Sequence, residues 1–97
     1  MTLEEILEKE REIWGEAPFP PTPLDDMIAI WGVVFGDICR LSRDGGSARP
    51  HYRAELQKEM GNLIATTIRF IDDKGFDLNE CLELALASQR AFRKRNE

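Results

Sequence analysis

Apolar residues recur every three or four positions along most of the chain, the spacing that places them on one face of an α-helix. We expect helices over about residues 2–14, 23–43, 47–74 and 78–95, with residues 17–23 forming a proline-rich linker. No stretch alternates between apolar and polar positions in the manner of a β-strand. The pattern therefore predicts one all-α domain over residues 1–97 that resembles a four-helix bundle. Its parts are an N-terminal helix within residues 1–16, the linker, and core helices within residues 24–95.

Capping residues mark the expected helix starts. Thr2 with Glu5, and Asp77 with Glu80, have the spacing of capping boxes. Ser47 is the expected cap of the third helix, with a proline tolerated in its first turn. Glycines, which end helices readily, stand at the expected stops of the first three helices: Gly15, Gly45, Gly46 and Gly75.

The second expected helix is apolar on more than one face. Its apolar residues are Met27, Ile28, Ile30, Trp31, Val33, Val34, Phe35 and Ile38. A helix that is hydrophobic most of the way round is buried on most sides. In so small a domain this pattern predicts a subunit interface as well as a core. The last helix is expected to turn its own apolar stripe inward, made of Cys81, Leu82, Ala85, Leu86 and Phe92.

Composition and charge narrow the possible partners. The net charge is −5, which argues against binding a nucleic-acid backbone, because such proteins normally present a basic face. A nucleotide ligand stays possible, since a metal ion can bridge an acidic site to phosphate. No apolar run is long enough to span a membrane, and the N-terminus lacks the pattern of a signal peptide. We therefore expect a cytoplasmic protein, with Cys39 and Cys81 as buried free thiols.

The candidate chemistry lies on the two long helices. Polar residues of the third helix follow one another at steps of four, three, four and three, so they share one side: Glu55, Glu59, Asn62, Thr66 and Arg69. Asp37 is the one charged residue within the apolar part of the second helix, where an unpaired charge is costly. Its expected partner is either an arginine (Arg40, Arg53 or Arg69) or a metal ion, and the spacing leaves both open. His51 is the one histidine in the sequence and is expected at the surface. A serine or cysteine triad is unsupported, because no second histidine is present to act as its base.

Two segments together resemble a known family. They are ELQKEMGNLI at residues 55–64 and FIDDKGFDLNEC at residues 70–81, and they resemble MazG-like nucleotide pyrophosphohydrolases. That family is all-α and forms dimers or tetramers. Its enzymes hydrolyse nucleoside triphosphates to the monophosphate and pyrophosphate with Mg²⁺. The resemblance covers roughly residues 24–95.

The resemblance implies particular site residues. Asp37 and Glu59 would be catalytic and would ligate Mg²⁺, with Asn62 and Glu55 assisting. The basic residues expected to meet phosphate charge are Arg53, Lys58 and Arg93.

The chain departs from the family at several ligand positions. Val33 and Val34 stand where two glutamates are expected, Asn62 replaces an aspartate, and Asp37 replaces a glutamate. Two carboxylates and an amide would hold one Mg²⁺ weakly. Two functions follow as hypotheses: a divergent nucleoside triphosphate pyrophosphohydrolase, or a catalytically degenerate member that binds nucleotides or proteins.

Overall fold

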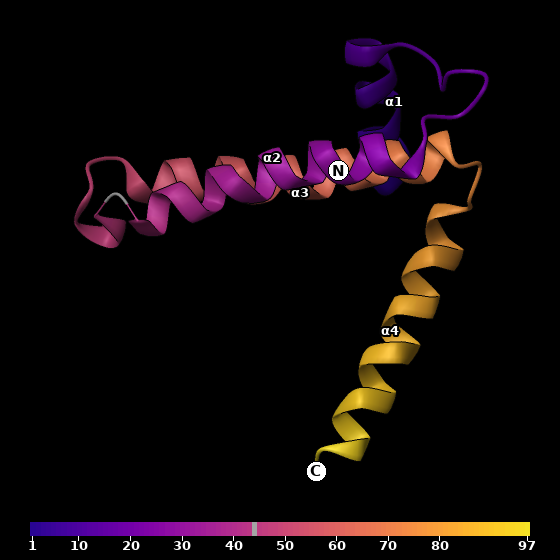
Figure 1. Ribbon diagram of the computed structural model, residues 1–97. Helices are drawn as coiled ribbons and strands as arrows, with labels where there is room; N and C mark the ends of the chain where they lie inside the picture. Colours follow the sequence, from indigo (N-terminus) through magenta and orange to yellow (C-terminus); the bar gives the residue numbers. More distant parts are fainter. Residues whose placement is uncertain (44) are drawn as a thin grey trace.

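The computed structural model describes residues 1–43 and 45–97, and these residues form helices without any strand (Figure 1). The elements are α1 (Leu3–Trp14), α2 (Leu24–Arg43), a short 3₁₀ helix η1 (Gly46–Ala48), α3 (Tyr52–Asp73) and α4 (Leu78–Arg95). The expected all-α class and its four long helices are confirmed. None of the described helices has both the length and the apolar character needed to cross a bilayer.

Two of the expected caps are present. The Thr2 hydroxyl oxygen accepts a hydrogen bond from the Glu5 backbone N–H at 3.1 Å. The Asp77 carboxylate accepts one from the Glu80 backbone N–H, also at 3.1 Å. Each bond satisfies an N–H that has no partner inside its helix, and this fixes where α1 and α4 begin.

The expected start of the third helix at Ser47 is wrong. The chain forms η1 there, and α3 begins only after His51, whose φ of 62° is left-handed. The cause is Pro50, since a proline disfavours the helical conformation of the residue before it. Arg49 is accordingly extended, with φ −74° and ψ 136°. His51 is exposed, as expected.

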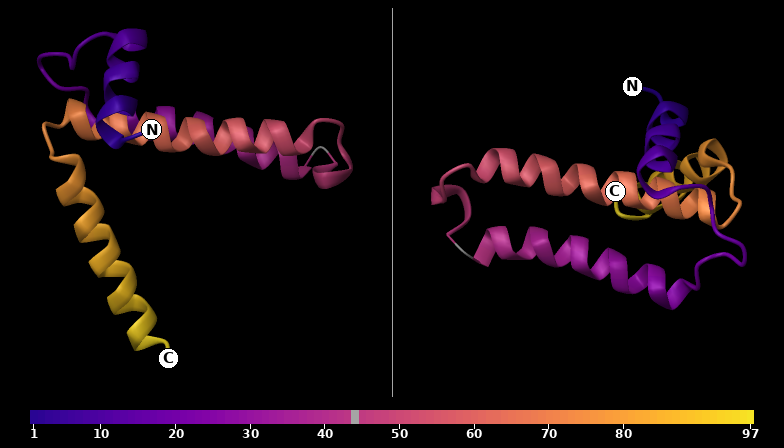
Figure 2. Two further views of the ribbon diagram at one scale, coloured as in Figure 1. Left: turned by 180° about the vertical axis from the view of Figure 1, so that it is seen from behind. Right: turned by 90° about the horizontal axis from the view of Figure 1, so that it is seen from above.

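Helices α2 and α3 form an antiparallel hairpin that contains most of the core (Figure 2). The Trp31 ring meets Phe70 edge to face, with 5.0 Å between ring centroids. Its indole N–H donates to the Thr67 hydroxyl at 2.9 Å. The most buried apolar side chains come from three helices: Met27, Leu41, Ile68, Phe70 and Leu78.

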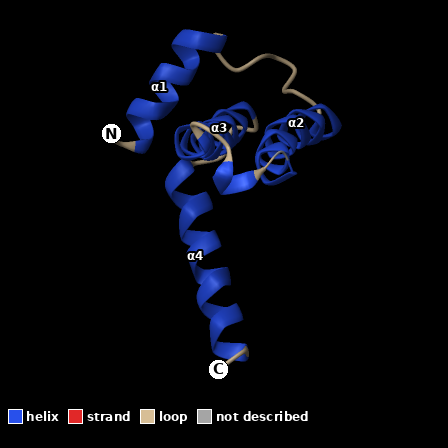
Figure 3. Ribbon diagram, turned by 90° about the vertical axis from the view of Figure 1, so that its left-hand side faces the viewer, coloured by secondary structure: helices blue, strands red, loops and turns tan. Residues whose placement is uncertain are grey.

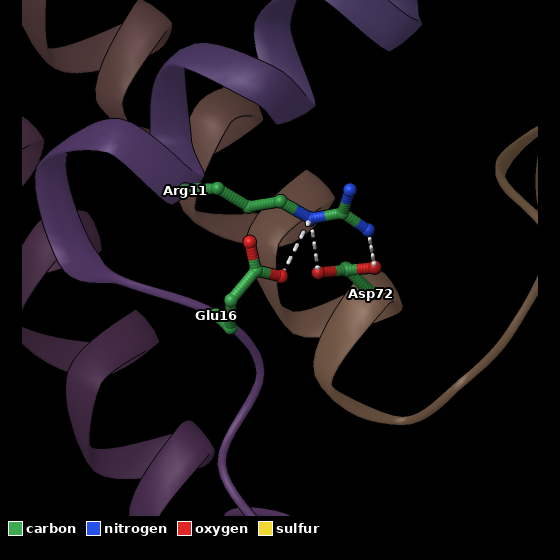
Figure 4. Close-up of polar contacts among 3 residues, drawn as sticks. All are labelled: Arg11, Glu16 and Asp72. Atoms are coloured by element: carbon green, nitrogen blue, oxygen red, sulfur yellow. Dashed lines mark hydrogen bonds and ion pairs between the residues drawn. The ribbon is translucent and has the colours of Figure 1, made fainter.

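Helix α1 crosses the C-terminal half of α3, on the side opposite to that from which α4 leaves (Figure 3). Arg11 donates two hydrogen bonds to Asp72, at 3.1 Å from Nε and 2.6 Å from a terminal nitrogen (Figure 4). This hydrogen-bonded pairing raises the pKa of Arg11 above its usual value. The linker is tied to the same end of α3, because the Thr22 backbone N–H donates to Asp73 at 2.9 Å.

Helix α4 projects away from the other helices, so its apolar stripe does not turn inward as expected (Figure 1). Leu82, Leu86 and Phe92 are exposed, and Cys81 is half-buried. Cys39 on α2 is also exposed. Both thiols are free, but the expectation that they are buried is wrong for a single chain. The physical reason is that α3 covers one side of α2 only, and the turn at Gly75 directs α4 outward.

The open arrangement leaves much surface uncovered. The accessible surface is 7557 Å². A compact monomer of this mass exposes roughly 5,700 Å² by the usual scaling with mass. The radius of gyration is 15.8 Å, against about 12.5 Å for a compact domain of this length.

Candidate functional site

A polar pocket lies between the C-terminal part of α2 and the N-terminal half of α3. Its volume is about 360 Å³. We call it the hairpin pocket, and its lining residues are Asp37, Arg40, Leu41, Arg49, Glu55, Lys58 and Glu59. The antiparallel hairpin thus brings Asp37 and Glu59 to one cavity, together with Glu55 and Lys58.

Asp37 has an arginine partner within its own helix. Its carboxylate forms an ion pair with Arg40, one turn further along α2. Arg40 is one of the three arginines considered from the sequence. Both side chains are partly exposed, so water screens this pair and it contributes little to stability.

Glu59 is the most buried acidic residue among those described, at 8% exposure. One carboxylate oxygen accepts a long hydrogen bond of 3.4 Å from the Asn62 amide. The same oxygen lies 3.5 Å from the Lys58 ammonium. The other oxygen, Oε2, is buried and has no hydrogen-bond donor among the described residues.

Glu55 repeats this situation one turn earlier on the same face of α3. Its Oε2 is buried without a hydrogen bond, although the Arg49 guanidinium lies 3.5 Å away. A buried carboxylate oxygen without a donor costs free energy unless a cation or another donor satisfies it. The hairpin pocket therefore presents incompletely neutralised oxygens from two neighbouring carboxylates.

These oxygens fit one mode of divalent-cation binding. Within residues 1–43 and 45–97, no three acidic, histidine or cysteine side chains lie close enough together to form a protein cage for a metal. Mg²⁺ is commonly held by one or two carboxylates, with water and substrate phosphates completing its octahedral shell. Glu59 and Glu55 match that mode, while Asp37 is engaged by Arg40.

The other residues suggested by the sequence are scattered. Asn62 contacts Glu59 but lines a different cavity, described below. Arg53 is exposed and does not line the hairpin pocket. Arg93 lies in the last turn of α4. Because α4 leaves the C-terminal end of α3 and projects away from the hairpin, Arg93 does not reach the hairpin pocket of its own chain (Figure 1). Val33 is 66% exposed, and Val34 lines that other cavity.

A larger cavity of about 680 Å³ lies between α1, α2 and α3, and we call it the α1 groove. Asn62, Thr66 and Arg69 line it from α3, so the predicted polar face of α3 runs from the hairpin pocket into this groove. Trp14 lines it from α1, and the Arg69 guanidinium carbon lies 4.5 Å from the Trp14 ring centroid. Sequence reasoning missed Trp14, although the alignment of Thr66 and Arg69 was a signal that this face of α3 continues past Asn62.

Comparison of the chain with protein-family models, with curated proteins and with solved structures finds no match.

Proposed function

We propose that this chain is a MazG-like nucleotide pyrophosphohydrolase that converts nucleoside triphosphates to monophosphates and pyrophosphate with Mg²⁺. The observation that carries the proposal is the buried Oε2 of Glu59, which has no donor among the described residues, with a second buried oxygen one turn away, the Oε2 of Glu55, that has only the ion pair with Arg49. Such oxygens favour a bound cation, because a cation removes the cost of burying their charge. The resemblance of residues 55–64 and 70–81 to the family supplies the reaction type.

In the proposed reaction, a water oxygen bonds to the α-phosphorus as the bond to the oxygen bridging to the β-phosphorus breaks. Pyrophosphate leaves, and the proton of the water passes to solvent. Mg²⁺, when bound, neutralises phosphate charge and stabilises the negative charge that develops on the leaving group. Within the chain, Glu59 and Glu55 would hold the cation.

Asp37 lines the same pocket from α2 and would join these carboxylates when its ion pair with Arg40 opens. Arg40, Arg49 and Lys58 also line the pocket and balance the three carboxylates in charge. They would meet the phosphate oxygens, as the sequence suggested for Lys58.

A second candidate is a catalytically degenerate member of the same fold that binds nucleotides without cleaving them. Two observations favour it: Val33 and Val34 replace two expected ligands, and no cage of three ligands exists among the described residues. Both candidates share the nucleotide ligand and differ only in turnover.

We also propose that the protein self-associates, as at least a dimer, with a second copy covering the exposed apolar faces. The described chain exposes roughly 1,900 Å² more than a compact monomer of this mass would. An obligate dimer buries about 1,000 to 2,500 Å² per subunit, so the excess is of the right size. The exposed apolar side chains that such an interface would cover lie on three helices: Ile28, Val33 and Phe35 on α2, Met60 and Ile64 on α3, and Leu82, Leu86 and Phe92 on α4. The two free thiols support a reducing, cytoplasmic setting for this assembly.

The test of the proposed reaction is pyrophosphate release from a panel of standard and modified deoxynucleoside triphosphates with Mg²⁺ or Mn²⁺. We expect turnover by the wild type and its loss in Glu59→Gln. Glu83→Gln, an exposed change of the same kind on α4, is the matched control and should retain activity. Metal-dependent nucleotide binding without any turnover would favour the degenerate candidate. The absence of both would refute the two candidates together.

A further inference from the structure

The part of the α1 groove around Arg69 combines an exposed aromatic ring with a cation that has no ion-pair partner among the described residues. Trp14 is 65% exposed although it lines a cavity. The Arg69 guanidinium stacks on it at 4.5 Å, and it also lies 5.1 Å from the Phe70 ring. Arg69 forms no hydrogen bond or ion pair with any described residue, and its Nε is buried without an acceptor. A guanidinium has five donors, so this one has unused capacity for an acceptor.

The position of Trp14 is fixed by contacts on either side of it in the chain. Arg11 lies one turn earlier on α1 and is clamped to Asp72 by two hydrogen bonds. Thr22, at the end of the linker, is held by Asp73. The chain on both sides of Trp14 is therefore tied to α3 before any ligand arrives, which lowers the entropic cost of binding against the ring.

The same face of α3 connects this part of the groove to the proposed cation site. Asn62 lines the groove and donates to Glu59, which lines the hairpin pocket. Ten residues separate Glu59 from Arg69, a distance of roughly 15 Å along the helix. An extended nucleotide has a comparable length, so one molecule could reach both ends.

The charges of the two cavities decide which part of a nucleotide would lie at which end. Four carboxylates line the α1 groove, against two guanidinium groups, and these residues are Glu10, Glu16, Asp72, Asp73, Arg11 and Arg69. A triphosphate placed there would be repelled, whereas an uncharged ring would not. The hairpin pocket is lined by three cationic and three carboxylate side chains. A bound divalent cation would make its net charge positive, which favours phosphate.

We propose that Trp14 and Arg69 form the base-recognition site of the nucleotide, an inference that rests on the proposed function. The guanidinium now covers one face of the indole ring. On binding, the base takes that face, and the displaced guanidinium donates a hydrogen bond in the plane of the base to one of its carbonyl oxygens. Thymine, uracil, cytosine and guanine carry such a carbonyl and adenine does not. The site therefore favours nucleotides of the first four bases over adenine nucleotides.

The test is the affinity of the full chain for nucleoside monophosphates without added metal, measured by titration calorimetry. The probes are dTMP, dGMP, dAMP and the base-free 2-deoxyribose 5-phosphate. We expect dTMP and dGMP to bind more tightly than dAMP, and dTMP to quench the fluorescence of Trp14. Trp14→Leu should weaken dTMP binding about tenfold or more, the usual effect of losing one base–aromatic stack. Trp14→Phe keeps a stacking surface and should stay within a few-fold of wild type.

Several results would overturn the inference. One is dTMP binding that is equally tight in wild type and Trp14→Leu, with circular dichroism showing both folded. Another is a base-free sugar phosphate that competes with dTMP as well as dAMP does, because that result would make Arg69 a phosphate site. Failure of the wild type to bind any of the monophosphates would also overturn it.

This inference and the proposed reaction fail separately. If Glu59→Gln abolishes turnover while Trp14→Leu leaves KM unchanged, the reaction stands and the base site does not. If dTMP binding depends on Trp14 while no triphosphate is cleaved, the base site stands and the reaction does not.

Discussion

Replacing Glu59 by glutamine removes a charge from the most buried acidic position among the described residues, while nearly preserving its shape. In the absence of metal, we expect Glu59→Gln to be more stable than the wild type. The reason is that Oε2 of Glu59 is buried without a donor, and a neutral amide is less costly to leave in that position.

The size of the effect follows from the contacts of the carboxylate. A buried, unsatisfied polar group costs about 1–3 kcal/mol, more when it is charged. The Asn62 amide at 3.4 Å and the Lys58 ammonium at 3.5 Å offset part of this cost through the other oxygen. We therefore expect a net gain of about 1 kcal/mol, which raises the melting temperature of a domain of this size by roughly 4–8 °C.

The assay is thermal unfolding followed by circular dichroism at one fixed protein concentration, with a chelator and then with increasing Mg²⁺. Mg²⁺ at ten times its Kd should stabilise the wild type by about 1.4 kcal/mol and leave Glu59→Gln unchanged, so the difference between the two proteins disappears. Glu83→Gln should melt within about 0.5 kcal/mol of the wild type and respond to Mg²⁺ in the same way. The reasoning is refuted if Glu59→Gln melts below the wild type in chelator, or if Mg²⁺ stabilises both proteins equally.

Three further changes test other parts of the structure. Trp31→Phe removes the indole hydrogen bond to Thr67 and should cost about 1–2 kcal/mol in urea unfolding, whereas no measurable change would show that this bond is not formed in solution. Arg11→Met removes both hydrogen bonds to Asp72, so amide exchange within α1 should accelerate while α3 stays protected; equal protection of α1 would contradict the clamp. Leu86→Glu introduces a charge on the exposed apolar face of α4 and should convert a dimer to a monomer in light scattering without loss of helix; a wild type that is already monomeric would contradict self-association.

The helix boundaries that depend on neighbouring residues could be predicted from the sequence. Thr2 and Asp77 act on donors three residues away, so their spacing was sufficient. The start of α3 is also determined locally, because Pro50 acts on Arg49 and overrides the capping signal of Ser47.

The direction of α4 and the exposure of Cys39 could not be predicted, because they depend on which surfaces pack together. An apolar stripe shows that a face is to be covered, and it does not show what covers it. The stripe of α4 predicts a face turned to the interior, whereas within one chain Leu82, Leu86 and Phe92 face outward.

The candidate site also combines features that follow from neighbouring residues with features that depend on how the helices pack. The alignment of Glu59 with Asn62 along α3 follows from helical periodicity, and the hydrogen bond between the two side chains confirms it. The contact between Trp14 and Arg69 joins residues far apart in sequence, so no local pattern could indicate it. The burial of Glu59, which supports the proposed function, likewise depends on how α2 packs against α3.

The most direct test of the proposed reaction is the phosphorus NMR spectrum of a deoxynucleoside triphosphate incubated with the wild-type protein and Mg²⁺. The proposal predicts equal amounts of nucleoside monophosphate and pyrophosphate, formed by the wild type and not by Glu59→Gln. An unchanged triphosphate across the whole panel, or diphosphate with orthophosphate in place of pyrophosphate, would contradict it.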